Sequence, residues 1–229
     1  MNIWVVTGHT QSDDEAKYRQ WCELAEATNP SKEAYAKQHG YRFYYSRHEP
    51  QENGAYCKLD IILRSFEQGA DIVFWSDTDA RITNTDITIE SLIDTPAGIT
   101  LTADILGTNT GVMILQNCPR VRDFLWACNT YGKAWHGVGG WAEQTSIREF
   151  MKTPPYNEPG FIRHLPQRVM NSYTYYCDGR SNDDKAIWQD GDFMLHLPGM
   201  GHEKRMELFK RFDDIDKEQN NGNEEGHGI

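Results

Sequence analysis

Basic side chains are scarce in this sequence, which has 23 Lys and Arg against 34 Asp and Glu and a net charge of −11. A general nucleic-acid-binding protein needs a basic face to neutralise phosphate charges, so this balance argues against that class. A nucleotide held at one local site beside a metal ion is still compatible with it. We therefore expect no nucleic-acid partner.

Paired cysteines and long apolar runs are also missing. The five cysteines are odd in number and none forms a Cys-x-x-Cys pair, which argues against a zinc site and a disulfide framework. No segment is long enough to cross a bilayer, and the chain opens on a strand-like run without the features of a signal peptide. We expect a cytoplasmic protein with reduced thiols and no membrane span.

The remaining composition is that of a globular chain, with 38% apolar and 12% aromatic residues among 229. This length fits one large α/β domain with a substantial core. We place that domain at residues 1–212. The stretch 213–229 is polar and acidic, and we expect it to be a disordered tail. Nothing in the pattern indicates an oligomeric state.

The most informative motif is Asp77-Thr78-Asp79, which directly follows the apolar run 71–76. That run is too short and too rich in β-branched and aromatic residues for a helix, so it predicts a buried strand. Open α/β sheets bind ligands at the carboxyl ends of their strands. Two carboxylates at that place suit a hard divalent cation, which commonly joins protein to phosphate. The alternative interpretation is a turn that ends the strand.

The order of predicted elements indicates a parallel α/β half followed by a mixed half. We predict strands at 3–8, 41–46, 71–76, 97–102, 112–116 and 193–197, and helices at 55–68, 119–131, 141–151 and 203–212. Another helix starts at the acidic cap 12–15 and is expected to break near Pro30. Ser31 would then cap a second helix, which ends at Gly40.

Several blocks, taken in their order and spacing, resemble glycosyltransferase family 34. The blocks are Val5-Val6-Thr7-Gly8, Tyr35-Ala36, His39-Gly40-Tyr41, Tyr56-Cys57-Lys58, Phe74 to Ala80, Asn109-Thr110-Gly111, Gln116-Asn117-Cys118, Glu143 to Ser146, and His196-Leu197-Pro198-Gly199. The resemblance spans roughly residues 3–202. It implies a single GT-A domain, the Rossmann-like fold of nucleotide-diphospho-sugar transferases, with a mixed central sheet.

The same resemblance implies a chemistry. Family members are retaining galactosyl-, mannosyl- and xylosyltransferases. A relative of this kind would move a hexose or pentose from a nucleotide sugar, UDP-sugar before GDP-sugar, to a glycan or another hydroxyl acceptor. It would use Mn²⁺ or Mg²⁺ as its cofactor.

The resemblance assigns the metal to Asp77, Asp79 and the distant His196. Asp77 is expected either to bind the metal or to reach the ribose or donor sugar, which places it among the catalytic residues. Neutral imidazole beside carboxylates favours Mn²⁺ over Mg²⁺, since nitrogen is the softer donor. Taken alone, a histidine on an apolar strand is also consistent with a core position.

The donor site implied by the resemblance contains Thr7, Gly8, Lys58 and Asn109. Gly8 has no Cβ and so lets a nucleoside approach the backbone closely. Asn109 would offer amide hydrogen bonds to sugar hydroxyls. The alternatives are an ordinary turn at Thr7-Gly8, a solvated side chain at Lys58, and a plain turn at 109–111.

Glu143-Gln144 stands where the family has an Asp-Gln pair, so the acid is longer in this chain. Retention requires a carboxylate nucleophile or a front-side attack with the leaving phosphate as base. Because Gln144 is a poor nucleophile, we expect front-side attack, with Gln144 stabilising the cationic sugar. Glu143 would orient the donor or the acceptor hydroxyl, and a helix-surface charge is its alternative interpretation.

The chain departs from the family pattern after Gly199, which matches the end of the last block. Related enzymes place a diphosphate-binding lysine shortly after this glycine. His202 is the nearest substitute here, because its ring can donate a hydrogen bond to a diphosphate. Lys204 and Arg205 are the other candidates.

Two other functions compete with the transferase. Aspartate-nucleophile phosphatases also end a strand with Asp-x-Asp, but their motif follows the first strand and has Thr or Val where this chain has Arg81. A non-catalytic sugar-binding module would keep aromatic residues but would not need the Asp pair, Gln144 and His196 together. In the transferase, the candidates for an acceptor platform are Trp135, His136, Trp141 and the run 173–176, because flat aromatic faces stack on sugars, and a core position is their alternative interpretation.

Eukaryotic relatives carry an N-terminal membrane anchor. Its absence here favours a bacterial or virus-encoded cytosolic enzyme, or a soluble catalytic domain.

Overall fold

The structure of the protein is a computed structural model. It describes residues 1–229 apart from 13, 49–53, 94–96, 133, 135–141, 175, 178–179, 182–184 and 225–229. It describes only the backbone of 176–177, 180–181 and 214–224. The aromatic residues Trp135, His136 and Trp141, proposed above for the acceptor, therefore lie outside the described residues.

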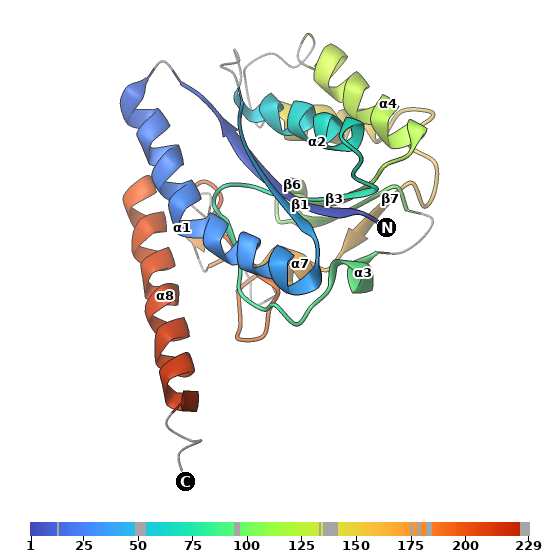
Figure 1. Cartoon of the computed structure of the whole chain (residues 1–229). Coiled ribbons are helices and arrows are strands. Elements are labelled where there is room, and N and C mark those ends of the chain that lie inside the picture. Colours follow the sequence, from blue (N-terminus) through green and yellow to red (C-terminus); the bar gives the residue numbers. More distant parts are fainter. Residues whose placement is uncertain are drawn as a thin grey trace.

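A six-stranded mixed sheet forms the centre of the molecule (Figure 1). The strands, in the order β2-β1-β3-β6-β5-β7, are β2 (Arg42–His48), β1 (Ile3–Thr10), β3 (Ile72–Ser76), β6 (Gly107–Gln116), β5 (Ile99–Asp104) and β7 (Ile162–Leu165). β1 pairs in parallel with β2 and β3, whereas β6 runs antiparallel to β3 and β5. The predicted α/β class with a mixed central sheet is confirmed.

Helices cover both faces of this sheet, because each has an apolar side to bury. α2 (Cys57–Glu67) and α4 (Pro119–Ala127) lie on one face, and α1 (Glu15–His39) lies on the other (Figure 1). α4 begins with a proline, as predicted, since the missing N–H costs nothing at the first helical position. The central strands contribute Trp4, Phe74 and Trp75 to the core, all buried.

Shorter elements connect these layers. They are η1 (Gly54–Tyr56), β4 (Ala80–Ile82), α3 (Ile89–Leu92), η2 (Cys128–Gly132), α6 (Ala142–Phe150), α7 (Gln167–Met170), β8 (Tyr176–Cys177), β9 (Arg180–Ser181) and β10 (Met194–His196). The segment 109–111 is part of β6, so the interpretation of that block as a plain turn is wrong.

The break predicted near Pro30 is also wrong, because α1 is continuous and Pro30 lies inside it. Ser31 does not start a new helix. Its Oγ donates to Thr28 O at 2.8 Å and accepts from Ile82 N at 3.2 Å. Buried residues on both sides of the proline keep one helix face packed, and α1 bends along its length (Figure 1), as a proline inside a helix predicts. The helix ends at Gly40 with a left-handed cap, as expected.

β4 and β10 form a small antiparallel sheet. The sequence pattern predicts a strand at 193–197, which contains β10, but none at β4. In the register of this sheet, His196 lies opposite Ala80, and Leu197 N donates to Asp79 O at 3.0 Å. This pairing carries a segment more than a hundred residues away in the chain to the Asp motif.

The last helix, α8 (His202–Glu224), runs beside α1 (Figure 1). It continues beyond residue 212, so part of the stretch predicted as disordered is helical. The domain boundary at 212 stays a prediction. Among the described residues, no helix is both long and apolar enough to cross a membrane. The four cysteines with described side chains, Cys22, Cys57, Cys118 and Cys128, are free.

Candidate active site

The Asp motif lies at the carboxyl end of β3 and is fixed from three directions. Asp77 N donates to Gly111 O at 2.7 Å, which ties the motif to β6. Thr78 Oγ1 donates to Gly8 O at 3.0 Å, which ties it to β1. Asp77 Oδ1 accepts from Trp75 Nε1 at 2.8 Å, so the side chain is held as well. A loose turn would not have these contacts.

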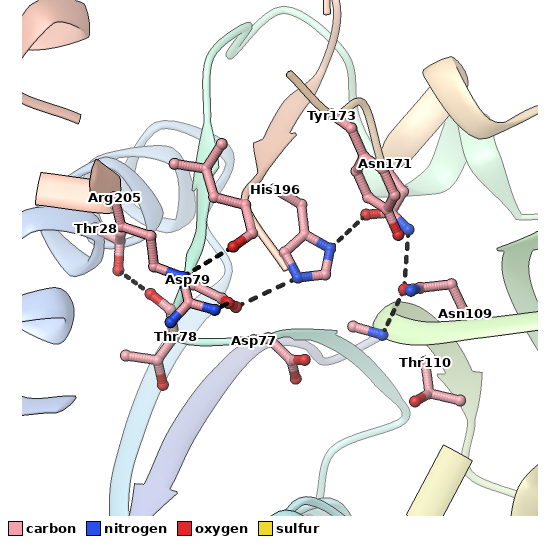
Figure 2. Close-up of polar contacts among 12 residues, drawn as sticks. Thr28, Asp77, Thr78, Asp79, Asn109, Thr110, Asn171, Tyr173, His196 and Arg205 are labelled. Atoms are coloured by element: carbon pink, nitrogen blue, oxygen red, sulfur yellow. Dashed lines mark hydrogen bonds and ion pairs between the residues drawn. The ribbon is translucent and has the colours of Figure 1, made fainter. Parts of the chain in front are cut away.

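Asp79 is buried between two cationic or potentially cationic side chains (Figure 2). Its Oδ1 lies 3.3 Å from His196 Nε2, and its Oδ2 lies 2.7 Å from an Arg205 guanidinium nitrogen. Burial alone would raise the pKa of Asp79, but His196 and Arg205 outweigh burial and lower it to about 2. Asp79 is therefore ionised at neutral pH.

His196 is positioned by its neighbours in β10 and β6. Its ring lies against Gly111, where an added Cβ would be only 2.2 Å from His196 Cε1. A side chain at position 111 would displace the ring. The glycine that the resemblance singled out in Asn109-Thr110-Gly111 thus makes room for a histidine.

Asp77, Asp79 and His196 form the group that could hold a metal among the described residues, with one ligand atom from each within 4.8 Å of the others. Two oxygens bound on opposite sides of a small cation at about 2.1 Å are about 4.2 Å apart, so this spacing is close to that of a coordination shell. Two carboxylates and an imidazole also form a donor set that suits Mn²⁺. The residues present fit a divalent cation, and the structure brings together the three residues that were expected to bind it.

Lys58 links this group to the expected catalytic pair. Its Nζ lies 3.0 Å from Asp77 Oδ1 and 2.8 Å from Glu143 Oε1, and it donates to Thr110 O at 2.9 Å. Burial lowers the pKa of Lys58, but Asp77 and Glu143 outweigh burial and raise it above its usual value. Lys58 and Glu143 are both buried, so their interpretations as a solvated lysine and a surface charge are wrong.

Gln144 is held differently from Glu143. Its Oε1 accepts from Thr110 N at 3.1 Å, which fixes the amide against β6. Among the described residues, Glu143 lines the cavity beside the Asp motif and Gln144 does not.

That cavity has a volume of about 520 Å³ and opens where β1 and β3 end, as expected for an α/β sheet. The start of α2 and the N-terminal part of α1 close its sides. Gly8, His9, Lys58, Asp77 and Asp79 are among its lining residues. The size and position suit a nucleotide-sized ligand.

The other predicted donor-site residues have internal partners. Thr7 is fully buried, and its Oγ1 accepts from Lys32 Nζ at 3.3 Å. Gly8 lines the cavity, but an added Cβ would lie 2.4 Å from Ser46 O, so the neighbouring strand also requires a glycine. Asn109 Oδ1 accepts from Gly111 N at 2.9 Å.

After Gly199, which has a positive φ of 65°, the structure separates the three candidate cations. His202 Nε2 is 2.7 Å from Glu23 Oε2, and Lys204 pairs with Glu207 on the exposed side of α8. Arg205 reaches Asp79.

Lys32 is a residue of this region that sequence reasoning missed. It is fully buried on α1, and its Nζ donates to Asp77 O at 3.0 Å. Burial lowers its pKa to about 7, although Asp79 and Asp77 act in the opposite direction. The signal was present in the spacing of Leu24, Thr28 and Lys32, which places them on one buried helix face.

Comparisons with known proteins bear on the fold and on the class of enzyme. The model of the galactosyl transferase GMA12/MNN10 family matches residues 1–100. A solved glycosyltransferase involved in the glycosylation of the major capsid of PBCV-1 superposes with a TM-score of 0.73 at 18% identity, covering 92% of this chain and 100% of that one. The galactosyltransferase LgtC, solved with donor and acceptor sugar analogs, gives 0.50 at 14% identity, with 91% and 95% covered. No match was found among curated proteins.

The fold is therefore the GT-A fold, as the sequence blocks implied. The chain is a glycosyltransferase similar to the galactosyl transferase GMA12/MNN10 family.

Proposed function

We propose that this enzyme transfers a hexose or pentose from a nucleoside diphosphate sugar to a hydroxyl of a glycan, with retention at the anomeric carbon. The observation that carries the proposal is the convergence of Asp77, Asp79 and His196 beside a cavity at the ends of β1 and β3. UDP-sugar is the proposed donor, by the resemblance to family 34. A cytoplasmic location is proposed because the four cysteines with described side chains are free, as is usual in a reducing compartment.

Asp77, Asp79 and His196 would hold Mn²⁺, or Mg²⁺ as the second choice. Such a cation, when bound, stabilises the negative charge of a leaving diphosphate as a Lewis acid. Arg205 supports this task from the protein side, because its guanidinium holds Asp79 Oδ2 and leaves Oδ1 facing His196. Of the three cations considered after Gly199, we propose that Arg205 offsets charge at the diphosphate.

For the sugar side of the reaction, we propose that Glu143 faces the donor sugar. Glu143 lines the cavity, and its carboxylate lies 2.8 Å from the buried Lys58 ammonium. An ionised carboxylate stabilises the oxocarbenium character that develops when the sugar–phosphate bond breaks. Gln144, with its Oε1 committed to Thr110, would set the position of β6 below the sugar. We retain front-side attack, in which the leaving phosphate accepts the proton of the acceptor hydroxyl.

A thermal-shift comparison of UDP and GDP, each with and without Mn²⁺, tests the donor site. A ligand at 100 times its Kd that binds only the folded state adds about 2.7 kcal/mol of stability. We expect UDP with Mn²⁺ to raise the Tm of the wild type and of the exposed control Asp123→Asn. Asp79→Asn should lose the Mn²⁺-dependent part. A wild type that shows no metal-dependent shift with any nucleotide would contradict the proposal.

Hydrolysis of a panel of nucleotide sugars then identifies the donor sugar. The anomeric configuration of a transfer product, read by NMR, decides the stereochemistry. An inverted product would rule out front-side attack while leaving the donor site intact.

A further inference from the structure

Three buried polar side chains lie in a row that begins at His196, a member of the metal-binding group, and leads away from Asp79 (Figure 2). His196 comes from β10, Asn171 follows α7, and Asn109 belongs to β6. They come from three different parts of the chain. Neither of the two hydrogen bonds that join them is explained by the donor-site roles discussed above.

The hydrogen atoms along this row can be assigned from a backbone group. Gly111 N can only donate, and it lies 2.9 Å from Asn109, so the atom of Asn109 facing it is the carbonyl Oδ1. The other end of that amide, Nδ2, donates to Asp104 Oδ2 at 3.1 Å. A carboxylate oxygen there accepts, which agrees with the assignment.

The orientation of Asn171 follows from that of Asn109. Asn171 Nδ2 donates to Asn109 Oδ1 at 3.0 Å and to Thr102 Oγ1 at 2.9 Å. Its Oδ1 therefore points the other way, toward His196 Nδ1, at 2.8 Å. A carbonyl oxygen only accepts, so Nδ1 of His196 carries a hydrogen.

An imidazole that ligates a metal is neutral, so a hydrogen on Nδ1 makes Nε2 the nitrogen whose lone pair is available to a cation. Nε2 is the atom that faces Asp79, 3.3 Å from Oδ1. The backbone fixes the same alignment, since His196 N donates to Ser172 O at 2.8 Å and so places Asn171 beside the histidine.

We infer that Asn109 and Asn171 form an asparagine relay that orients His196. The Gly111 N–H fixes the orientation of the Asn109 amide, and Asn109 in turn fixes that of Asn171. Asn171 then holds the hydrogen of His196 on Nδ1, so that Nε2 is presented to the divalent cation. Both asparagines are positioning residues, because they act through His196. The inference rests on the metal site of the proposed function. It also gives Asn109 a role other than binding sugar hydroxyls, since its Oδ1 accepts from Gly111 and Asn171 and its Nδ2 donates to Asp104.

The first test is an NMR measurement of the histidine ring nitrogens in the ¹⁵N-labelled, metal-free and nucleotide-free protein. The His196 signals are identified by their loss in His196→Gln. We expect the hydrogen on Nδ1 in the wild type. An Nδ1 without hydrogen would overturn the relay. This measurement needs no variant of the relay, so it decides the matter even if such a variant fails to fold.

The second test is the affinity for Mn²⁺ alone, measured by electron paramagnetic resonance. Loss of a group that orients a ligating histidine weakens metal binding by about 10- to 100-fold. We expect that loss for Asn171→Leu, together with a changed His196 ring spectrum. The matched control is Thr102→Val, which removes another hydrogen bond of Asn171 but leaves Oδ1 on the ring. It should keep the wild-type ring spectrum and nearly the wild-type affinity.

The outcomes separate the relay from the metal site. A folded Asn171→Leu that binds Mn²⁺ as tightly as the wild type, while His196→Gln binds it weakly, would overturn the relay alone. If His196→Gln also bound Mn²⁺ as tightly as the wild type, the metal site itself would be wrong.

Discussion

Two buried lysines flank Asp77 from opposite faces of the sheet, and their surroundings are opposite too. On the α1 side, Lys32 Nζ donates to the backbone oxygen of Asp77 and to the hydroxyls of Thr7 and Thr28. On the α2 side, Lys58 Nζ contacts the carboxylates of Asp77 and Glu143. Neutral acceptors do not compensate for burial as fully as carboxylates do.

The consequence appears in the two pKa values. That of Lys32 is lowered to about 7 by burial, and that of Lys58 is raised by its carboxylates despite burial. Lys58, which lies beside Glu143, therefore keeps its proton to a higher pH than a free lysine, whereas Lys32, on α1, loses its proton near pH 7. Lys32 of α1 thus holds the backbone of the Asp motif, whereas Lys58 of α2 provides the positive charge beside its carboxylate.

The largest effect is expected for Lys58→Met. It leaves the buried carboxylate of Glu143 and the partly buried carboxylate of Asp77 without their cation, and breaking a buried ion pair in this way costs about 3–5 kcal/mol of unfolding free energy. Urea denaturation measures the loss, with the exposed Lys37→Met as the matched control.

A second substitution tests the cause. Glu143→Gln in the Lys58→Met background removes one of the uncompensated charges and should recover part of the stability. Equal losses for Lys58→Met and Lys37→Met would contradict the buried network.

The next effect concerns pH, and Lys32 is its source. Between pH 7 and 10.5, an unfolded lysine keeps its proton while Lys32 in the folded protein has lost it. The unfolded state then binds more protons, so folding stability rises with pH, by roughly 2 kcal/mol from pH 7 to 9. Below about pH 7 both states are protonated and this contribution to the slope vanishes.

Urea denaturation of the wild type and of Lys32→Met at pH 7, 8 and 9 measures that slope. Lys32→Met should lack it, so the difference between the two proteins should grow with pH. Lys58 should add no slope in this range, because its pKa is raised in the folded state. Parallel curves for the wild type and Lys32→Met would show that Lys32 does not titrate there.

The same two residues illustrate how much the sequence predicts. Lys58 lies in a block that resembles the family, in the helix before the Asp strand, so its position near the donor was expected. Lys32 carries no motif. Its burial depends on α1 continuing through Pro30, and the local rule for proline argued against that. Tertiary packing of the helix face outweighed the local rule.

Long-range pairing explains the other differences. The Asp motif follows a strand that is visible in its own composition, so local pattern was sufficient. β4 has three residues and is defined only by its pairing with β10, which no local pattern indicates. Asn171 likewise becomes relevant only when Ser172 and Leu195 are brought together. His196 was identified through the resemblance alone, and the structure supplies the physical reason for its place.

The smallest effect is expected for Thr28→Val. Thr28 Oγ1 lies 2.8 Å from Thr78 O and 3.4 Å from Lys32 Nζ, so the change removes one donor from the Asp motif and one acceptor from the lysine. Losing such a hydrogen bond costs about 1 kcal/mol. With one acceptor fewer, the pKa of Lys32 should fall further, and the stability rise should begin at lower pH than in the wild type. Urea denaturation from pH 6 to 8 would detect the shift, and an unchanged onset would show that Thr28 does not help to hold the proton on Lys32.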